Sequence, residues 1–285
     1  MSEASRRGFF RDAFQSAARA ALRAEAEPEA PPEEIVAPLL TEAEIERYSR
    51  QLVLPDWSEE AQIALRDASV LVVGAGGLGS PVALYLAGAG VGRVGLVDSD
   101  VVEISNLHRQ PLHFTPDVGE PKAESAAAKL RFLNPDIVVE AYRMRVDETN
   151  APGLIEGQDL VIDCSDTFAT RYAVNQACCD AGVDLIEGGA VGWAGLVMTI
   201  VPKRTACYRC AFPTAPTGAP TCSQAGITGP VAGVIGSLQA LEALKFLTGA
   251  HAPLVDAFLN VDLATLETTR VSVRRAPDCL DCGDA

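Results

Sequence analysis

The chain has 285 residues, of which 48% are hydrophobic and 21% are charged, and its formal net charge at pH 7 is −15. This length is enough for one large core or two small ones. The acidic balance excludes the basic surface that nucleic-acid binding requires, and the sequence lacks a run of about 18 uncharged apolar residues that would predict a transmembrane helix. We therefore expect a globular protein in the cytoplasm, with neither nucleic acid nor a membrane as a partner.

The first 40 residues differ in composition from the rest of the chain. They are rich in Ala, Glu, Arg and Pro, and residues 25–37 have the composition of a linker that does not pack. Residues 5–11 resemble a twin-arginine export signal, but residues such as Asp12 and Arg19 interrupt the apolar stretch that this signal requires. We therefore expect a flexible N-terminal arm over residues 1–40 and one folded domain over residues 41–285.

Helical and extended segments then alternate along the chain. The first predicted helix begins at Thr41, which forms a capping-box pattern with Glu44. Strands are expected at 69–73, 93–98, 137–142, 159–164 and 184–187, with helices at 78–90, 122–133 and 170–181. After residue 190 the pattern changes to strands at 193–201, 258–262 and 268–273 and a helix at 231–247. This predicts an α/β fold, a Rossmann-like, doubly wound and mostly parallel sheet with an antiparallel C-terminal extension.

A glycine-rich loop lies between the first predicted strand and the next helix. Residues 74–79 read GAGGLG and fit the pattern G-x-G-x-x-G, with glycines at Gly74, Gly76, Gly77 and Gly79. Glycines allow a tight turn, and the following helix N-terminus offers unpaired N–H groups to phosphates. Asp98 ends the second strand, where a carboxylate can accept hydrogen bonds from ribose hydroxyls. Taken alone, these features favour an NAD site over a purely structural turn.

Charged residues after the second and fourth predicted strands favour nucleotidyl transfer instead. Attack of a carboxylate on ATP builds negative charge on the α-phosphate and on the leaving pyrophosphate, which Arg109 and Lys122 can neutralise. Asp166 follows the strand at 159–164, at the edge where open α/β sheets bind ligands, and can hold Mg²⁺. Each residue alone would be expected on a solvated surface. Their joint placement at strand ends favours a catalytic site.

Four of the eight cysteines form two C-x-x-C pairs, Cys207 with Cys210 and Cys279 with Cys282. Four thiolates suit a tetrahedral structural Zn²⁺ ion. The second pair lies near residue 285, where zinc would anchor a segment that has little core of its own. We therefore predict a structural zinc site, with a redox dithiol as the alternative.

Together these motifs resemble the ThiF/MoeB/HesA adenylyltransferases, the bacterial relatives of ubiquitin-activating enzymes, and are closest to the molybdopterin-synthase adenylyltransferase (MoeB) branch. The resemblance runs from Arg47 to Gly283 and identifies residues 41–285 as a domain of this type. Its motifs are residues 47–51, 74–79, 98, 105–110, 119–122, 163–166, 207–210, 221–222, 233–240 and 279–282. Ser165 and Thr167 stand where MoeB has Thr and Asn, a mild departure.

The resemblance implies a function. The chain would use ATP to adenylate the C-terminal glycine carboxylate of a small ubiquitin-like sulfur carrier of the MoaD/ThiS type that ends in Gly-Gly. Pyrophosphate would leave, and thiocarboxylate formation would follow. In this assignment Asp98 binds the ribose, while Asn106 and Gln110 line the nucleotide pocket. Arg109 and Lys122 contact the phosphates. The position of Asp166 in the family is near the metal and the α-phosphate.

The resemblance also implies roles that the residues alone would not suggest. Arg50, which by itself would belong to a solvated helix face, corresponds to an arginine that reaches the phosphates of the neighbouring subunit, and this implies a homodimer. Cys222 corresponds to a cysteine that can bond to the activated carrier, but it can equally be an unreactive loop thiol. No rhodanese-type extension follows residue 285, so we expect a separate sulfur donor, a cysteine desulfurase or a rhodanese.

Two other classes of function stay open at this point. An NAD-dependent oxidoreductase would bind NAD tightly and would not exchange pyrophosphate with ATP. A non-catalytic scaffold would bind the carrier without needing Arg109. A tRNA-modifying dehydratase of the same superfamily is a further alternative, which the acidic balance and the cysteine pairs disfavour. Which carrier is activated, in a molybdopterin, tungstopterin, thiamin or other pathway, does not follow from the sequence.

Overall fold

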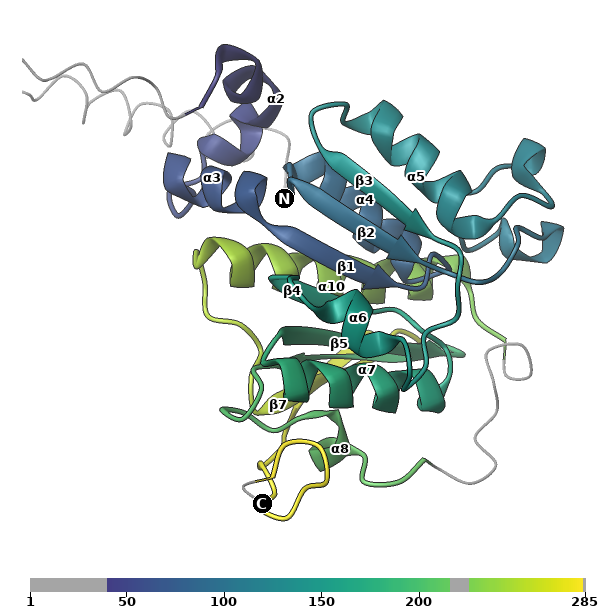
Figure 1. The fold of residues 1–285 in the computed structure, drawn as a ribbon, viewed down its shortest axis with the longest axis vertical. Coiled ribbons are helices and arrows are strands. Elements are labelled where there is room, and N and C mark those ends of the chain that lie inside the picture. Colours follow the sequence, from purple (N-terminus) through teal and green to yellow (C-terminus); the bar gives the residue numbers. More distant parts are fainter. Residues whose placement is uncertain (1–39, 216–225, 284–285) are drawn as a thin grey trace, which may run out of the picture. The chain divides into compact units, whose positions relative to one another are not determined.

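The computed structural model describes residues 40–215 and 226–283 (Figure 1). These residues form an α/β unit around one eight-stranded sheet. The predicted arm lies outside them except for its last residue, Leu40, which is buried. Cys222 also lies outside the described residues.

The sheet has the predicted composition, parallel strands followed by an antiparallel extension. Its strand order is β3-β2-β1-β4-β5-β6-β7-β8. The parallel strands are β1 (Ser69–Val73), β2 (Arg93–Val97), β3 (Val138–Tyr142), β4 (Leu160–Asp163) and β5 (Asp184–Val191). The strands β6 (Ala194–Ile200), β7 (Ala257–Asp262) and β8 (Glu267–Ser272) are antiparallel. The strand β5 extends past the predicted end at residue 187 because its last residues pair with β6.

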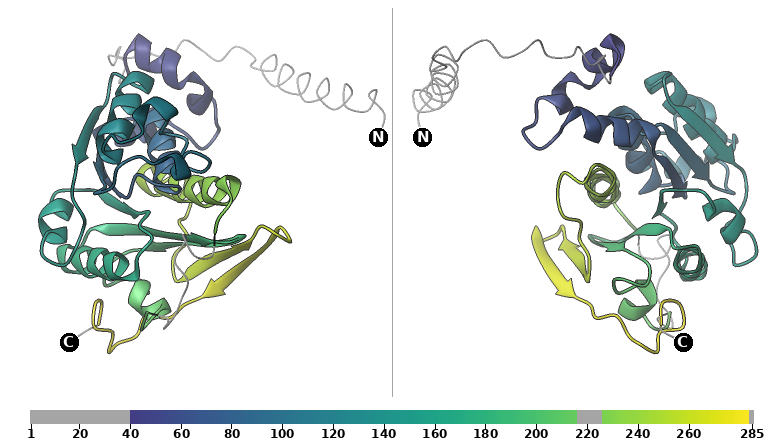
Figure 2. Two further views of the ribbon diagram at one scale, coloured as in Figure 1. Left: turned by 90° about the vertical axis from the view of Figure 1, so that its right-hand side faces the viewer. Right: turned by 60° about the vertical axis from the view of Figure 1, so that its left-hand side comes forward.

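Helices cover both faces of this sheet (Figures 1 and 2). Successive residues of β1 point to opposite faces. Val70 and Val72 pack in one apolar cluster with α3 (Glu59–Asp67), α4 (Gly79–Ala89), α5 (Lys122–Leu133) and α10 (Gly229–Thr248). Leu71 and Val73 pack in a second cluster with α6 (Ala151–Ile155), α7 (Phe168–Ala181) and α8 (Tyr208–Ala211). Burial on both faces explains why these strands are continuously apolar.

The predicted capping box begins the first helix, α2 (Glu42–Leu52). The Thr41 hydroxyl oxygen accepts from the Glu44 N–H at 3.2 Å, and the Thr41 N–H donates to the Glu44 carboxylate at 2.7 Å. The next helix, α3, was not predicted, although Ser58 caps it by accepting from the Ala61 N–H. Its nine residues are too few for a clear helical periodicity in the sequence.

The last long helix, α10, is apolar enough by length and composition to cross a membrane. In this fold it packs in the sheet's apolar cluster through residues such as Ala232 and Ile235. It also carries Glu242, whose carboxylate accepts from the Thr199 hydroxyl of β6 at 2.9 Å. Its apolar composition is therefore that of a core helix.

The turn from β1 into α4 depends on two glycines. Gly74 has a φ of +98°, a backbone angle that residues with a side chain rarely adopt. A Cβ atom on Gly79 would lie 1.8 Å from the Gly74 carbonyl oxygen. The helix therefore approaches the end of the strand more closely than any other residue at position 79 would allow.

A matched pair of glycines on α4 tests this close approach. We expect Gly79→Ala to lower the free energy of unfolding by about 2–3 kcal/mol, because the backbone must shift to relieve the overlap. Gly88→Ala is the control, since its added Cβ would have no heavy atom within 4 Å. It should leave stability unchanged or raise it by about 0.5–1 kcal/mol. Urea denaturation measures both, and equal effects would contradict this account of the turn.

Candidate active site

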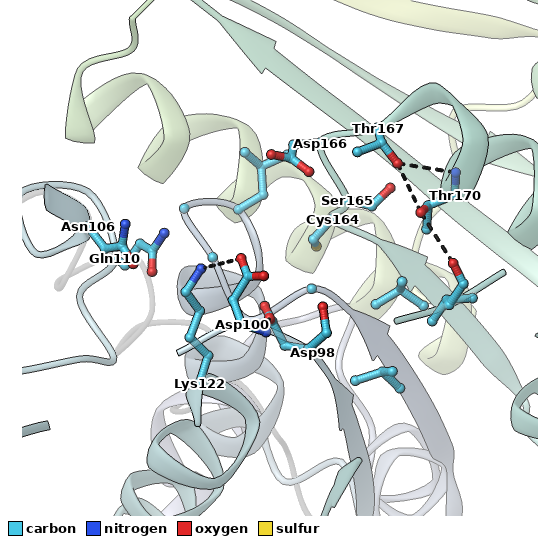
Figure 3. Close-up of a pocket in the computed structure, with 18 of the residues that line it drawn as sticks. Asp98, Asp100, Asn106, Gln110, Lys122, Cys164, Ser165, Asp166, Thr167 and Thr170 are labelled. Atoms are coloured by element: carbon cyan, nitrogen blue, oxygen red, sulfur yellow. Dashed lines mark hydrogen bonds and ion pairs between the residues drawn. The ribbon is translucent and has the colours of Figure 1, made fainter. Parts of the chain in front are cut away.

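A cavity of about 610 Å³ opens at the carboxyl ends of β1, β2 and β4 (Figure 3). The strand order reverses here, because β2 lies on one side of β1 and β4 on the other, and such a reversal is where open α/β sheets bind ligands. Most of the predicted site residues line the cavity, namely Gly74, Gly76, Gly77, Asp98, Asn106, Arg109, Gln110, Lys122 and Asp166. Gly79 lies behind the loop, against Gly74.

Asp98 connects the end of β2 to the glycine loop. One carboxylate oxygen accepts from the Ala75 N–H and the other from the Asp100 N–H, both at 2.8 Å. Burial raises the pKa of Asp98, while these N–H donors and the Lys122 ammonium group lower it. Asp98 therefore shapes the loop and also presents a carboxylate to the cavity, where a ribose hydroxyl can donate to it.

Two cations stand at the cavity wall. Lys122 begins α5, and its side chain is 8% exposed, with Nζ 2.9 Å from the Asp100 carboxylate. The Arg109 guanidinium donates to the Ser105 carbonyl at 2.8 Å and lies 3.0 Å from a His108 ring nitrogen. Local contacts therefore hold both positive groups at the cavity wall. An anionic ligand could either replace these contacts or bind to the same groups in addition to them.

The segment after β4 places Asp166. The Asp163 carboxylate accepts from the Ser165 N–H at 2.7 Å, and the Arg171 guanidinium donates to the Ser165 carbonyl at 2.9 Å. Both sides of the Ser165 backbone are therefore fixed. Asp166 itself is exposed to the cavity, as a ligand for a hydrated cation needs to be.

Two charged residues beneath this segment were missed by the sequence analysis. Arg171 lines the cavity, and its guanidinium lies 3.3 Å from the carboxylate of Glu187, which is fully buried. Asp163 and Glu187 are register partners on adjacent strands. Burial raises the pKa of both carboxyls, so one guanidinium beside two carboxyls favours a proton on the pair. The sequence held one indication of this pair, because Glu187 lies in a strand that was expected to be buried.

Asn106 and Gln110 come from the connection between β2 and α5, which includes the 3₁₀ turns η1 (Ile104–Asn106) and η2 (Thr115–Asp117). The Asn106 side chain accepts from the Glu103 N–H at 3.2 Å. The side-chain amide oxygen of Gln110, Oε1, is buried and finds no partner among the described residues. A buried acceptor of this kind is costly unless a ligand or water donates to it.

One predicted catalytic residue, Arg50, is described by the structure but does not line this cavity. Arg50 lies on α2, is exposed, and is not among the described residues that line the cavity. The place of Cys222 is outside the described residues. The prediction for Arg50 requires a second subunit, and it stays a prediction.

The two C-x-x-C pairs come together at a second place. The Sγ atoms of Cys207, Cys210, Cys279 and Cys282 all lie within 4.8 Å of one another. Cys207 and Cys279 are 3.6 Å apart, and Cys210 and Cys282 are 3.5 Å apart. A tetrahedral zinc ion with sulfur ligands at about 2.3 Å would place the sulfurs about 3.8 Å apart. The cluster therefore has the ligand set of a zinc site, with sulfur separations near those that zinc requires.

A hydrogen-bond network surrounds the cysteine cluster. A contact with the Cys179 thiol is the main cause that lowers the pKa of Cys207, which favours its thiolate form. Asp281, between the last two cysteines, accepts from the Asn175 amide of α7 and from the Arg209 guanidinium. These contacts attach the C-terminal segment to α7 beside the sulfur atoms. Hydrogen bonds around metal ligands commonly orient the ligands in this way.

Comparison with known proteins agrees with this geometry. The ThiF family model matches residues 48–281. A sulfur carrier protein adenylyltransferase from Thermus thermophilus is 47% identical over 251 residues, covering 86% of this chain and 93% of that protein. The SAMP-activating enzyme E1 of Haloferax volcanii is 43% identical, covering 86% and 91%. A crystal structure of E. coli MccB with ATP superposes with a TM-score of 0.75 at 27% identity, covering 84% of this chain and 75% of that one.

The family match covers most of the chain, including the glycine loop, the residues that line the cavity and three of the four cysteines of the cluster; Cys282 lies just beyond it. The similar proteins named as adenylyltransferase and activating enzyme are enzymes, and the fold described above is the one that the resemblance implied. The chain is an enzyme that belongs to the ThiF family.

Proposed function

We propose that this enzyme uses ATP to adenylate the C-terminal glycine carboxylate of a small ubiquitin-like sulfur carrier. The observation that carries the proposal is the placement of Arg109, Lys122 and Asp166 around one cavity with the glycine loop. An oxidoreductase site needs no such pair of cations beside a carboxylate. The names of the relatives from Thermus thermophilus and Haloferax volcanii support the same reaction.

The reaction follows from charge and position. The carrier's terminal carboxylate is ionised at neutral pH and needs no general base. One of its oxygens bonds to the α-phosphorus of ATP while the bond from that phosphorus to the bridging oxygen breaks, so pyrophosphate leaves with the electron pair. Arg109 and Lys122 neutralise the charge that develops on the phosphate oxygens. The products are the carrier acyl-adenylate and pyrophosphate, and catalysis consists of positioning and charge neutralisation.

Asp166 is the residue we assign to Mg²⁺. It is exposed at the cavity after β4, and Mg²⁺ usually binds one or two carboxylates together with phosphate oxygens and water. When bound, the ion would neutralise phosphate charge and orient the triphosphate. Arg171 and Asp163 act through the Ser165 backbone to place this carboxylate.

Sulfur is assigned to a separate donor protein, a cysteine desulfurase or a rhodanese. Among the described residues that line the cavity, the thiol is Cys164, which is buried and whose pKa burial raises well above its usual value. A neutral thiol of this kind is a poor nucleophile. The covalent role of Cys222 stays a prediction. A reaction that consumes ATP and needs reduced thiols suits the cytoplasm.

Carrier-dependent exchange between pyrophosphate and ATP tests this function. We expect exchange to require a carrier ending in Gly-Gly and to fall by at least about 100-fold in Arg109→Ala, the loss typical of removing one group that stabilises transition-state charge. The control is Arg93→Ala, which removes an exposed arginine at the amino end of β2 that pairs with Glu140. It should keep exchange within about twofold. No exchange with any carrier, together with tight NAD binding, would contradict the proposal.

A homodimer would supply Arg50 to the partner's cavity. We therefore expect Arg50→Ala and Arg109→Ala to be inactive alone but to complement each other when unfolded together and refolded. In a mixed dimer one site has both arginines and the other has neither, so random pairing restores about a quarter of the wild-type exchange rate. As a control for random pairing of the chains, wild-type chains are refolded together with chains that carry both substitutions. If the mixture stays inactive while mixed dimers form, Arg50 does not act across the interface.

The cysteine cluster is assigned to one structural zinc ion per chain. We expect metal analysis to find close to one zinc per chain, and Cys282→Ser to lose most of it and to unfold at a lower temperature, because a binding contribution to folding is lost. Cys178→Ala is the matched control, since Cys178 is buried on α7 and is not part of the cluster. Less than about half a zinc per wild-type chain would contradict the assignment.

A further inference from the structure

A buried histidine contacts the back of the glycine loop. His113 is 2% exposed and lies between the loop and α5. One ring nitrogen, Nε2, is 2.9 Å from the Ala75 carbonyl oxygen, and the other, Nδ1, is 2.9 Å from the Ser125 hydroxyl. Neither the family motifs named above nor the proposed reaction assigns His113 a role.

The partners of His113 determine where its protons lie. A carbonyl oxygen only accepts, so Nε2 must carry the hydrogen that it donates to Ala75. The Lys129 ammonium group only donates, and it lies 2.9 Å from the Ser125 hydroxyl oxygen. The Ser125 hydroxyl proton is then free to be donated to Nδ1. Donation therefore runs in one direction, from Lys129 to Ser125, from Ser125 to His113, and from His113 to Ala75.

The charges around His113 support a neutral ring. Burial is the main cause that lowers its pKa, and the Lys129 and Lys122 ammonium groups lower it further. The Ala75 carbonyl and the Asp117 carboxylate act in the opposite direction. Asp117 also pairs with Lys129 at 2.6 Å. The chain of donors requires a neutral imidazole. In a charged ring both nitrogens carry a hydrogen, so Nδ1 could not accept from the Ser125 hydroxyl.

The bond to Ala75 has a consequence inside the cavity. The Ala75 carbonyl and the Gly76 N–H belong to one planar trans peptide and point in opposite directions. Because His113 binds the carbonyl from behind the loop, the Gly76 N–H must point away from it, toward the cavity that Gly76 lines. The hydrogen bonds within residues 40–215 and 226–283 include none from this N–H. The preceding peptide is fixed as well, since the Ala75 N–H donates to Asp98.

We propose that His113 is a positioning residue of the nucleotide site, which donates through Nε2 to the Ala75 carbonyl and thereby directs the Gly76 N–H at a bound phosphate. The inference rests on the proposed function, because it takes the ligand of the loop to be ATP. A histidine that only filled the core would contribute to stability but would leave nucleotide affinity unchanged.

Calorimetric titration of ATP into the folded variants tests this role. His113→Phe keeps a ring but removes the donor, and we expect it to weaken ATP binding about ten- to thirty-fold, the loss of roughly one hydrogen bond to a charged group. His113→Gln carries an amide N–H at the same distance from the backbone as Nε2, and should bind ATP within about threefold of wild type. His251→Phe is the control, because His251 is an exposed histidine with a loose contact to Asp56 at 3.7 Å.

The outcomes separate this inference from the proposed function. If the wild-type enzyme does not bind ATP, the proposed function fails. If the wild type binds and His113→Phe binds equally well, or His113→Gln loses as much as His113→Phe, the positioning role is overturned. Nitrogen-15 NMR of the wild-type histidine rings tests the inference without nucleotide and without relying on the folding of any variant. The measurement is practical because the chain has only three histidines. We expect a neutral Nε2–H tautomer for His113 between about pH 6 and pH 8, and an Nδ1–H tautomer or a charged ring would overturn the inference.

Discussion

The close approach of Gly79 to the Gly74 carbonyl is the contact on which the site depends. It brings the first turn of α4 directly onto the end of β1, so that the helix N-terminus faces the cavity. Since β1 lies between β2 and β4, the segments that follow those two strands converge on the same point. Asp98, which follows β2, and Asp166, which comes after β4, line the same cavity for this reason. A larger residue at position 79 would push the helix away from the strand and increase the separation between the loop and these two carboxylates.

Much of the fold was predictable because the buried parallel strands are short, apolar and separated by clear helical segments. The strand at 69–73 and the helix at 122–133 have the predicted bounds. The helices α3, α6 and α8 were not predicted, since elements of nine, five and four residues are too short to show a periodicity. The cysteine pairs were recognisable from their spacing, and the fold then brings the four sulfurs together.

The candidate site was predictable where its residues belong to motifs at strand ends, and not where they act through contacts distant in sequence. His113 and Ala75 are 38 positions apart, and no local pattern relates them. Glu187 meets Asp163 only because β5 pairs with β4 in that register. Arg50 could be assigned only by resemblance, because its proposed partner lies on another chain. The glycine loop alone indicated NAD, and the two cations and the carboxylate opposite it changed that interpretation to ATP.

The central claim is that the cavity joins AMP to the end of a carrier protein. Intact-mass spectrometry of a carrier ending in Gly-Gly, incubated with the enzyme, ATP and Mg²⁺, tests it most directly. The account predicts a carrier heavier by one adenylate group, formed with release of pyrophosphate and absent when the terminal glycine is removed. A carrier that stays unmodified while ATP remains intact, with every candidate carrier supplied, would contradict it.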